Sequence, residues 1–379
     1  MSYLDTIEEL CQAGLHPGRT CRETKAATGK KLIGCVPYHT PDEVIYAGGC
    51  VPVGLWGGNP EFKQADRYLQ SFCCGLLRAV VEYSMDGTYS ILSGIVVPTF
   101  CDSMKCTLEN LKLSAPEGMP VLGMSYGQQR KLKAGREYTI REYKRIRHEI
   151  EKIAGVAITN EKVEDAFALY EDYRGTMRAF EDAAAEHPEI ITAKKRMMII
   201  KAGLFMDKAV YTPKVKEIIA GLKEEGPSAF DGKKIIITGI MAEPAGILDI
   251  FEENGLAIAA DEMSLGSRLW RARSREDVED VYERMAYRFA DTEADCFMYE
   301  PEKLRGQYML ALKEKYDADA VVVMMMKFCD PEQYDYPIYK AELEQAGIPM
   351  LYMEVDQQTT GFEQLRTRIQ SFREMLMQQ

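Results

Sequence analysis

The chain of 379 residues lacks the patterns that mark several large classes of protein. No run approaches the roughly 18 uninterrupted apolar residues that cross a bilayer, so we expect no membrane-spanning segment. The net charge of −12, without a basic tract interleaved with aromatic residues, argues against nucleic-acid binding. The acidic first residues have neither the basic nor the apolar region of a signal peptide, which predicts a cytoplasmic protein.

Motifs of several enzyme classes are also missing. The four histidines are scattered and form no His-x-x-x-His pair for zinc. The sequence has no Gly-x-x-x-x-Gly-Lys-Ser/Thr loop, no Gly-x-Gly-x-x-Gly after a strand and no Gly-x-Ser-x-Gly elbow. These absences argue against ATP hydrolysis through a phosphate loop, against a dinucleotide site of that type and against a serine hydrolase.

What the sequence does contain is two series of short apolar runs that alternate with segments of helical periodicity. The runs lie at residues 31–36, 51–56, 94–101 and 120–126, and then at 233–240, 256–260, 321–326 and 349–355. Strands that alternate with helices indicate parallel sheets. We therefore predict an α/β protein with two Rossmann-like lobes, residues 1–138 and 227–379. A helical region, residues 139–226, would lie between them.

Local signals predict further features of these lobes. Thr40 is expected to cap a short helix that has Pro41 at its first position. A longer helix is expected over residues 62–85, with Cys74 inside it. The charged stretch of residues 268–283 is expected to be a surface helix and loop.

Two of the predicted strands end in the same three residues. The runs at 94–101 and 321–326 both lead into Phe-Cys-Asp, which places Cys101 and Cys329 at strand ends. In open parallel sheets, ligands bind in the crevice beyond the carboxyl ends of the strands. Cys101 and Cys329 would therefore face a cleft between the lobes from opposite sides.

Ten cysteines in a cytoplasmic chain need an explanation other than disulfides, because thiols are kept reduced there. Three thiolates from different elements, here Cys74, Cys101 and Cys329, could hold an iron–sulfur cube. On spacing alone, buried packing thiols are the favoured interpretation, and the repeated Phe-Cys-Asp after two apolar strands weighs against it. Cys73 competes with Cys74, and Cys106 could be a ligand or a packing residue. The remaining cysteines are second-rank candidates, Cys35 and Cys50, or structural residues, Cys11, Cys21 and Cys296.

Seven short motifs, spread over the whole chain, resemble one protein family. They are Ile-Gly-Cys-Val-Pro-Tyr from Ile33, Pro-Asp-Glu from Pro41, Val-Pro-Val-Gly-Leu-Trp-Gly from Val51, Ser-Phe-Cys-Cys from Ser71, Pro-Thr-Phe-Cys-Asp from Pro98, Met-Met-Lys-Phe-Cys-Asp-Pro-Glu from Met325, and Val-Asp-Gln-Gln-Thr from Val355. Together they resemble the β subunits of the (R)-2-hydroxyacyl-CoA dehydratases, which are related to benzoyl-CoA reductase subunits.

The resemblance implies a heterodimer of this chain with a homologous α subunit, each with a [4Fe–4S] cluster held by three cysteines. Here the ligands would be Cys74, Cys101 and Cys329, in the cleft between the lobes. Cys74 is preferred to Cys73 because it precedes the small-apolar-apolar pattern that begins at Gly75. An ATP-dependent iron–sulfur activator would inject one electron, and acyl-CoA would bind mainly to the α subunit. Some relatives carry a flavin, which this sequence neither predicts nor excludes.

The implied reaction removes water from an (R)-2-hydroxyacyl-CoA and gives an (E)-2-enoyl-CoA. The hydrogen on carbon 3 is not acidic, and general acid–base catalysis contributes only about 10²–10⁴-fold. One-electron reduction of the thioester to a ketyl radical expels the hydroxyl group and makes that hydrogen acidic, after which the electron is returned. The β-subunit cluster would relay this electron, because such chemistry belongs to the cofactor. The sequence assigns no acid or base and does not specify the acyl group.

Two other interpretations stay open on the sequence alone. A benzoyl-CoA-type reductase subunit would use similar chemistry but keep the electrons in its product. A non-redox binding or structural subunit would have the same two lobes without a cluster. Product analysis separates the first from a dehydratase, and iron in the purified protein separates the second.

Overall fold

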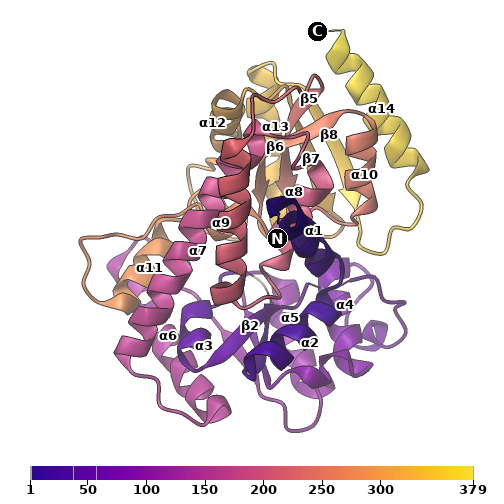
Figure 1. Ribbon diagram of the computed structural model, residues 1–379. Coiled ribbons are helices and arrows are strands. Elements are labelled where there is room, and N and C mark those ends of the chain that lie inside the picture. The colour runs from indigo at the N-terminus through magenta and orange to yellow at the C-terminus, as the bar shows by residue number, and fades with distance from the viewer. Residues whose placement is uncertain (1, 37, 57, 379) are drawn as a thin grey trace.

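The computed structural model describes residues 2–36, 38–56 and 58–378, which form two α/β lobes (Figure 1). Pro37, expected to stop the first strand, and Gly57, expected to begin a Gly-Gly turn, lie outside the described residues. Within the described ranges, no helix is both long enough and apolar enough to cross a membrane.

The first lobe is built on a parallel sheet with the strand order β2-β1-β3-β4. Its strands are β1 (Lys31–Cys35), β2 (Cys50–Gly54), β3 (Gly94–Pro98) and β4 (Val121–Met124). Helices α3 (Asp42–Ala47), α4 (Gly75–Met85) and α5 (Asp102–Ser114) connect them. All five residues of β3 are buried, because a central parallel strand is covered on both faces.

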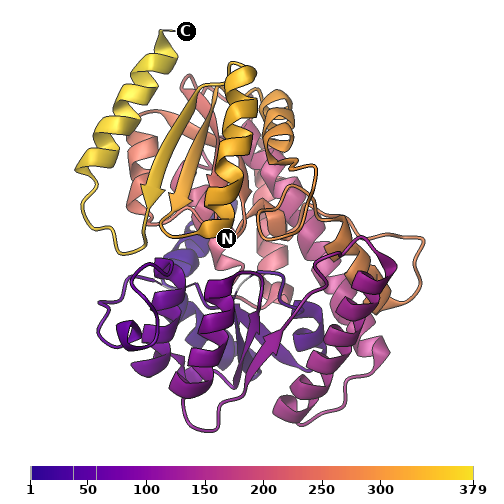
Figure 2. The ribbon, with the colours of Figure 1, turned by 180° about the vertical axis from the view of Figure 1, so that it is seen from behind.

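The second lobe repeats this order as β6-β5-β7-β8, again with parallel pairing throughout. Its strands are β5 (Lys233–Gly239), β6 (Leu256–Met263), β7 (Ala320–Met326) and β8 (Met350–Val355). Its helices are α10 (Gly246–Glu253), α11 (Val281–Asp291), α12 (Arg305–Tyr316), α13 (Asp330–Gln345) and α14 (Glu363–Met377). Two four-stranded parallel sheets confirm the predicted α/β class with two lobes. In Figure 2 the orange and yellow strands of the second lobe point towards the first lobe.

Four helices follow the first sheet and precede the second. They are α6 (Lys133–Ala154), α7 (Asn160–Glu186), α8 (Ala193–Ala202) and α9 (Lys208–Glu224). Helix α7 packs against α3 of the first lobe and against β6 of the second, so it braces both lobes. The N-terminal helix α1 (Tyr3–Leu15) packs on α8 and α9, and α2 (Pro17–Thr28) follows it. The predicted boundary after residue 138 falls inside α6, and the one after residue 226 falls between α9 and β5.

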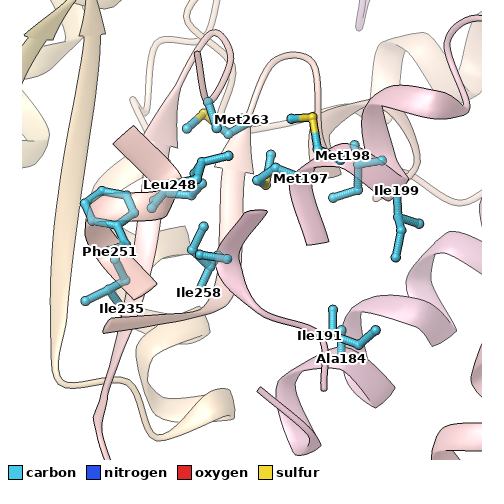
Figure 3. Close-up of a cluster of buried hydrophobic side chains, with 14 of the residues drawn as sticks. Ala184, Ile191, Met197, Met198, Ile199, Ile235, Leu248, Phe251, Ile258 and Met263 are labelled. Atoms are coloured by element: carbon cyan, nitrogen blue, oxygen red, sulfur yellow. The ribbon is translucent and has the colours of Figure 1, made fainter. Parts of the chain in front are cut away.

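One apolar core joins the helical segment to the second sheet (Figure 3). It forms where α8 and α10 pack against each other and against β6. Its side chains include Met197, Met198, Ile235, Leu248, Phe251 and Ile258. Close-packed protein interiors have low compressibility. Helix α8 and the second sheet are therefore held in a fixed position relative to each other.

The helix start predicted from Thr40 is wrong by one residue. Helix α3 begins at Asp42, and Pro41 occupies the cap position without a side-chain cap bond. The Thr40 hydroxyl instead donates to the carbonyl oxygen of Val36, at 3.0 Å. The hydroxyl is thus used to close the turn after β1 and is not free to cap the helix.

The helix predicted over residues 62–85 is also shorter than expected. Within this segment the structure has α4 and one turn of 3₁₀ helix at Ala65–Arg67. The buried carboxylate of Glu82 explains the difference. It accepts hydrogen bonds from the backbone N–H groups of Lys63, Gln64 and Ala65, at 3.1, 2.9 and 2.8 Å. These bonds fold the segment back onto α4, and Cys74 becomes the residue at the helix start.

Candidate functional site

Each of the three predicted cysteines occupies the N-cap position of a helix. Cys74 precedes α4, Cys101 precedes α5 and Cys329 precedes α13. The sulfur of Cys101 accepts a hydrogen bond from the backbone N–H of Met104, at 3.4 Å. Unpaired N–H groups give a helix start a partial positive charge. This charge stabilises a negatively charged sulfur at each of the three positions.

The structure brings these three thiols together from the two lobes. Burial raises the pKa of Cys329 well above its ordinary value, and the nearby charges of Glu332, Cys74 and Cys101 raise it further. Burial likewise raises the pKa of Cys74 to about 12, and Cys101 adds to that effect. The three side chains also share one apolar cluster, in which Cys329 is buried and the other two are partly buried. As thiols in this environment they are protonated, so a metal would bind in place of the protons.

The backbone that presents Cys329 is strained. Phe328, the residue before it, has a φ of 61° and a side chain that is 45% exposed. A bulky residue in this left-handed conformation costs about 1–3 kcal/mol, and such residues concentrate at functional sites. Pro331 then fits the first turn of α13, where its fixed φ favours the helix.

The competing cysteines take different positions. Cys73 is buried, and its sulfur lies 3.9 Å from the side-chain oxygen of Gln70. Cys106 is exposed on α5. Cys35 ends β1, with its sulfur 3.5 Å from the carbonyl oxygen of Ile33. Cys50 is the first residue of β2, so it lies at the edge of the sheet opposite to the carboxyl ends of the strands.

No group of three or more His, Cys, Asp or Glu side chains in residues 2–36, 38–56 and 58–378 is arranged to hold a single metal ion. This finding concerns a mononuclear site. In an iron–sulfur cube, each cysteine binds a different iron, so the ligands stand further apart than those around one ion. Cys74, Cys101 and Cys329 come from three separate helix starts in two lobes.

The loop after β8 crosses from the second lobe to the start of α4. The side-chain amide of Gln357 donates to the carbonyl oxygen of Trp56, at 3.0 Å, and that of Gln358 donates to Gly58, at 3.2 Å. A Cβ atom on Gly75 would lie 2.5 Å from side-chain oxygens of both Asp356 and Gln358. Any larger residue next to Cys74 would therefore displace the side chains of Asp356 and Gln358.

Beside Cys329 lies a buried ionic network that the sequence did not predict. Arg268, expected on a surface helix or loop, is only 1% exposed and binds Glu262 through two hydrogen bonds of 2.6 Å. The physical reason is β6, which continues past Ala260 and carries Glu262 into the interior. A buried carboxylate needs a paired cation, and Arg305 supplies the second one, at 3.0 Å. A charged residue inside an apolar strand is the signal that could have revealed this network.

Cys296, expected to be a structural cysteine, belongs to the same network. Its thiol donates to Glu332, at 3.2 Å, and its sulfur accepts from Arg268, at 3.4 Å. The network therefore contains a sulfur as well as carboxylates and guanidinium groups. It reaches from β6 to the first turn of the helix that Cys329 caps.

A cavity of about 700 Å³ opens elsewhere along the contact between the lobes. Its walls are largely aromatic and apolar, with a Lys201–Glu243 ion pair of 2.5 Å among them. The lining includes Trp56, Tyr83, Tyr89, Phe205 and Gln357. This volume suits a small organic ligand, but the cavity is lined by residues other than the three cysteines.

Comparison with known proteins identifies the same family as the sequence motifs. A family model described as 2-hydroxyglutaryl-CoA dehydratase, D-component, matches residues 37–376. The chain is 40% identical to the (R)-phenyllactyl-CoA dehydratase beta subunit of Clostridium sporogenes, over 92% of each chain. It is 36% identical to lactoyl-CoA dehydratase subunit beta of Anaerotignum propionicum, and 35% identical to (R)-2-hydroxyglutaryl-CoA dehydratase subunit beta of Acidaminococcus fermentans. Both of these matches cover 99% of this chain and 100% of the relative. The chain therefore belongs to the 2-hydroxyacyl-CoA dehydratase family that its sequence motifs predicted.

Proposed function

We propose that this chain is the β subunit of an (R)-2-hydroxyacyl-CoA dehydratase and that Cys74, Cys101 and Cys329 bind a [4Fe–4S] cluster in it. The observation that carries the proposal is the meeting of three helix-capping thiols, two from the first lobe and one from the second. The three relatives support the subunit assignment, because each is named as the β subunit of a dehydratase and is matched over at least 92% of its length.

The residues around the thiols suit such a group. A cluster bound here would supply one-electron transfer, at a potential set by burial, net charge and hydrogen bonds to sulfur. The chain contributes the three ligands, a largely apolar enclosure and the N–H of Met104 directed at Cys101. The loop that holds Gln357 and Gln358 closes the two lobes beside Cys74.

We assign the chain the role of electron relay for the conversion of an (R)-2-hydroxyacyl-CoA into an (E)-2-enoyl-CoA and water. The overall reaction is redox-neutral, so the electron acts catalytically and must be returned. A homologous α subunit would bind most of the acyl-CoA. A separate iron–sulfur activator would couple electron injection to ATP, since this sequence has no phosphate-binding loop of the Gly-Lys-Ser/Thr type. The ten free cysteines suit the reducing conditions of the cytoplasm, which we propose as its compartment.

Iron and acid-labile sulfide, measured in protein purified without oxygen, test the proposed ligands. The wild type should contain about four irons per chain, and Cys74→Ser, Cys101→Ser and Cys329→Ser should each lose most of them. Cys106→Ser is the matched control, because it changes an exposed cysteine five residues after Cys101 on the same helix, and it should keep its iron. An iron-free wild type, or full iron in all three variants, would refute the assignment.

Product analysis tests the dehydratase part separately. With its α subunit and activator, the protein should form enoyl-CoA while consuming far less than one reducing equivalent per product. Consumption of stoichiometric electrons, with a reduced product, would instead indicate a benzoyl-CoA-type reductase. Full activity of Cys101→Ala would indicate a structural subunit.

A further inference from the structure

Glu332 lies in the first turn of α13, three residues after Cys329, and its side chain is fully buried. Its carboxylate lies between two arginines, 2.8 Å from Arg305 and 3.2 Å from Arg268. Glu262 pairs with the same two arginines from the other side. The result is a buried set of two carboxylates and two guanidinium groups directly behind the helix start that presents Cys329.

Stability alone is a poor explanation for this network. Removing four charged groups from water is costly, and apolar residues of similar volume often stabilise a core as well or better. A buried ionic set of this kind therefore calls for a role that depends on charge. Its position, next to one of three converging thiols, indicates what that charge acts on.

Glu332 and Cys329 belong to the same turn of α13. Cys329 is the N-cap residue and Glu332 is the third residue of the helix, a spacing that makes their side chains neighbours on one face of the helix. Both side chains are buried. The two arginines and the thiol of Cys296, which donates to the same carboxylate, hold the Glu332 charge in one position.

We propose that Glu332 is a positioning residue that sets the reduction potential of the cluster assigned to Cys74, Cys101 and Cys329. The inference rests on the proposed function. A negative charge beside the cluster opposes the addition of an electron and so favours the oxidised form. Arg268 and Arg305 hold the carboxylate in place through ion pairs and offset part of its charge. Net charge and hydrogen bonds to sulfur are among the factors that set the reduction potential of an iron–sulfur cluster.

Redox titration of the full chain, purified without oxygen and followed by the electron paramagnetic resonance of the reduced cluster, tests this role. Glu332→Gln keeps the shape and removes the charge, so the potential should rise. We expect at least a tenfold change in the equilibrium constant for one-electron reduction, which corresponds to 59 mV. Glu332→Asp, which keeps the charge, should restore most of the wild-type value.

Asp335→Asn is the matched control. It removes one negative charge from the edge of the same network, where Asp335 pairs with Lys303 at 2.8 Å and with Arg305 at 3.6 Å. It lies three residues further along α13, so its effect on the potential should be less than half that of Glu332→Gln. Equal shifts of the potential in the two variants would mean that the potential depends on the total charge of the network and not on the position of Glu332. That result would overturn the inference.

A second variant decides the matter if Glu332→Gln does not fold. Cys296→Ala removes one hydrogen bond to the carboxylate and leaves more of its negative charge uncompensated, so the potential should fall. An unchanged potential in an iron-replete Cys296→Ala protein would contradict the inference and leave the proposed function intact. Iron-free wild-type protein would overturn both.

Discussion

Cys101 and Cys329 occupy equivalent positions in the two lobes. Each follows the strand that pairs with the first strand of its lobe, β3 beside β1 and β7 beside β5, and each caps the next helix. Residues that follow strands in both lobes share one apolar cluster, including Val36 and Tyr38 of the first and Ile240 and Leu265 of the second. A repeated strand–cysteine–helix unit thus delivers one thiol from each lobe to the same place.

Cys73 should not be a ligand, although it is adjacent to Cys74. Cys73→Ser should keep its full iron content, because Cys74 is the N-cap residue of α4, whereas the sulfur of Cys73 lies 3.9 Å from the side-chain oxygen of Gln70. Iron analysis of Cys73→Ser beside Cys74→Ser checks the choice. Loss of iron from Cys73→Ser alone would reverse the assignment within the pair.

The fold was largely predictable from the sequence because its strands are short apolar runs in chain order. β7, for example, is an all-apolar run of seven residues with three successive valines, and its short length and β-branched residues favour a buried strand over a helix. The position of Cys101 and Cys329 after the carboxyl ends of β3 and β7 was predictable for a related reason, since each follows a short apolar run directly in the sequence.

Features that depend on contacts between distant residues were not predictable. The segment before Cys74 has helical periodicity, but the carboxylate of Glu82 binds three of its backbone N–H groups and prevents a helix. Arg268 looks like a surface residue in a charged stretch, but Glu262 holds it inside. In each case one buried acidic side chain decides the structure of a segment elsewhere in the chain, and local patterns do not record that.

Gly75→Ala should destabilise the contact between the lobes. The added methyl group would lie 2.5 Å from the side-chain oxygens of Asp356 and Gln358. These side chains would have to shift, which would weaken the hydrogen bond from Gln358 to Gly58 at a cost of about 1 kcal/mol. Urea unfolding should show the loss. Gly175→Ala is the control, because it places a methyl group in α7 with its nearest neighbour 3.7 Å away and should be neutral or stabilising by up to about 1 kcal/mol. Similar losses in both variants would contradict the crowding at Gly75.

Gln357→Ala should loosen the two lobes without unfolding either of them. The substitution removes the donor to the Trp56 carbonyl, and a buried acceptor without its partner costs about 1–3 kcal/mol. Amide hydrogen exchange should become faster in the loops after β2 and β8, whereas exchange in β3 and β7 should stay slow. Glu354→Ala, an exposed change at the end of β8, should alter neither. Uniformly faster exchange throughout the chain would instead indicate global destabilisation.

Glu43→Gln should destabilise the protein in a manner that depends on pH. Burial alone would raise the pKa of Glu43, but the guanidinium groups of Arg288 and Arg174, at 2.6 and 2.7 Å, outweigh it and hold the pKa at about 2. Because the pKa is lower in the folded protein than in the unfolded chain, the ion pairs stabilise the fold fully above about pH 5. This stabilisation is lost as the pH falls from there towards 2. A shift of this size corresponds to about 3 kcal/mol.

The difference in free energy of unfolding between wild type and Glu43→Gln should therefore be about 3 kcal/mol at pH 7 and remain so at pH 5.5. It should narrow measurably at pH 4 and further at pH 3.5, where the unfolded wild type binds a proton that the folded state does not. Denaturant unfolding at these four values measures it. Glu109→Gln, on the exposed face of α5, should show almost no difference at any of them. A constant difference across the whole range would mean that Glu43 acts through its shape and hydrogen bonds, and that its charge contributes little to joining α3 to α7 and α11.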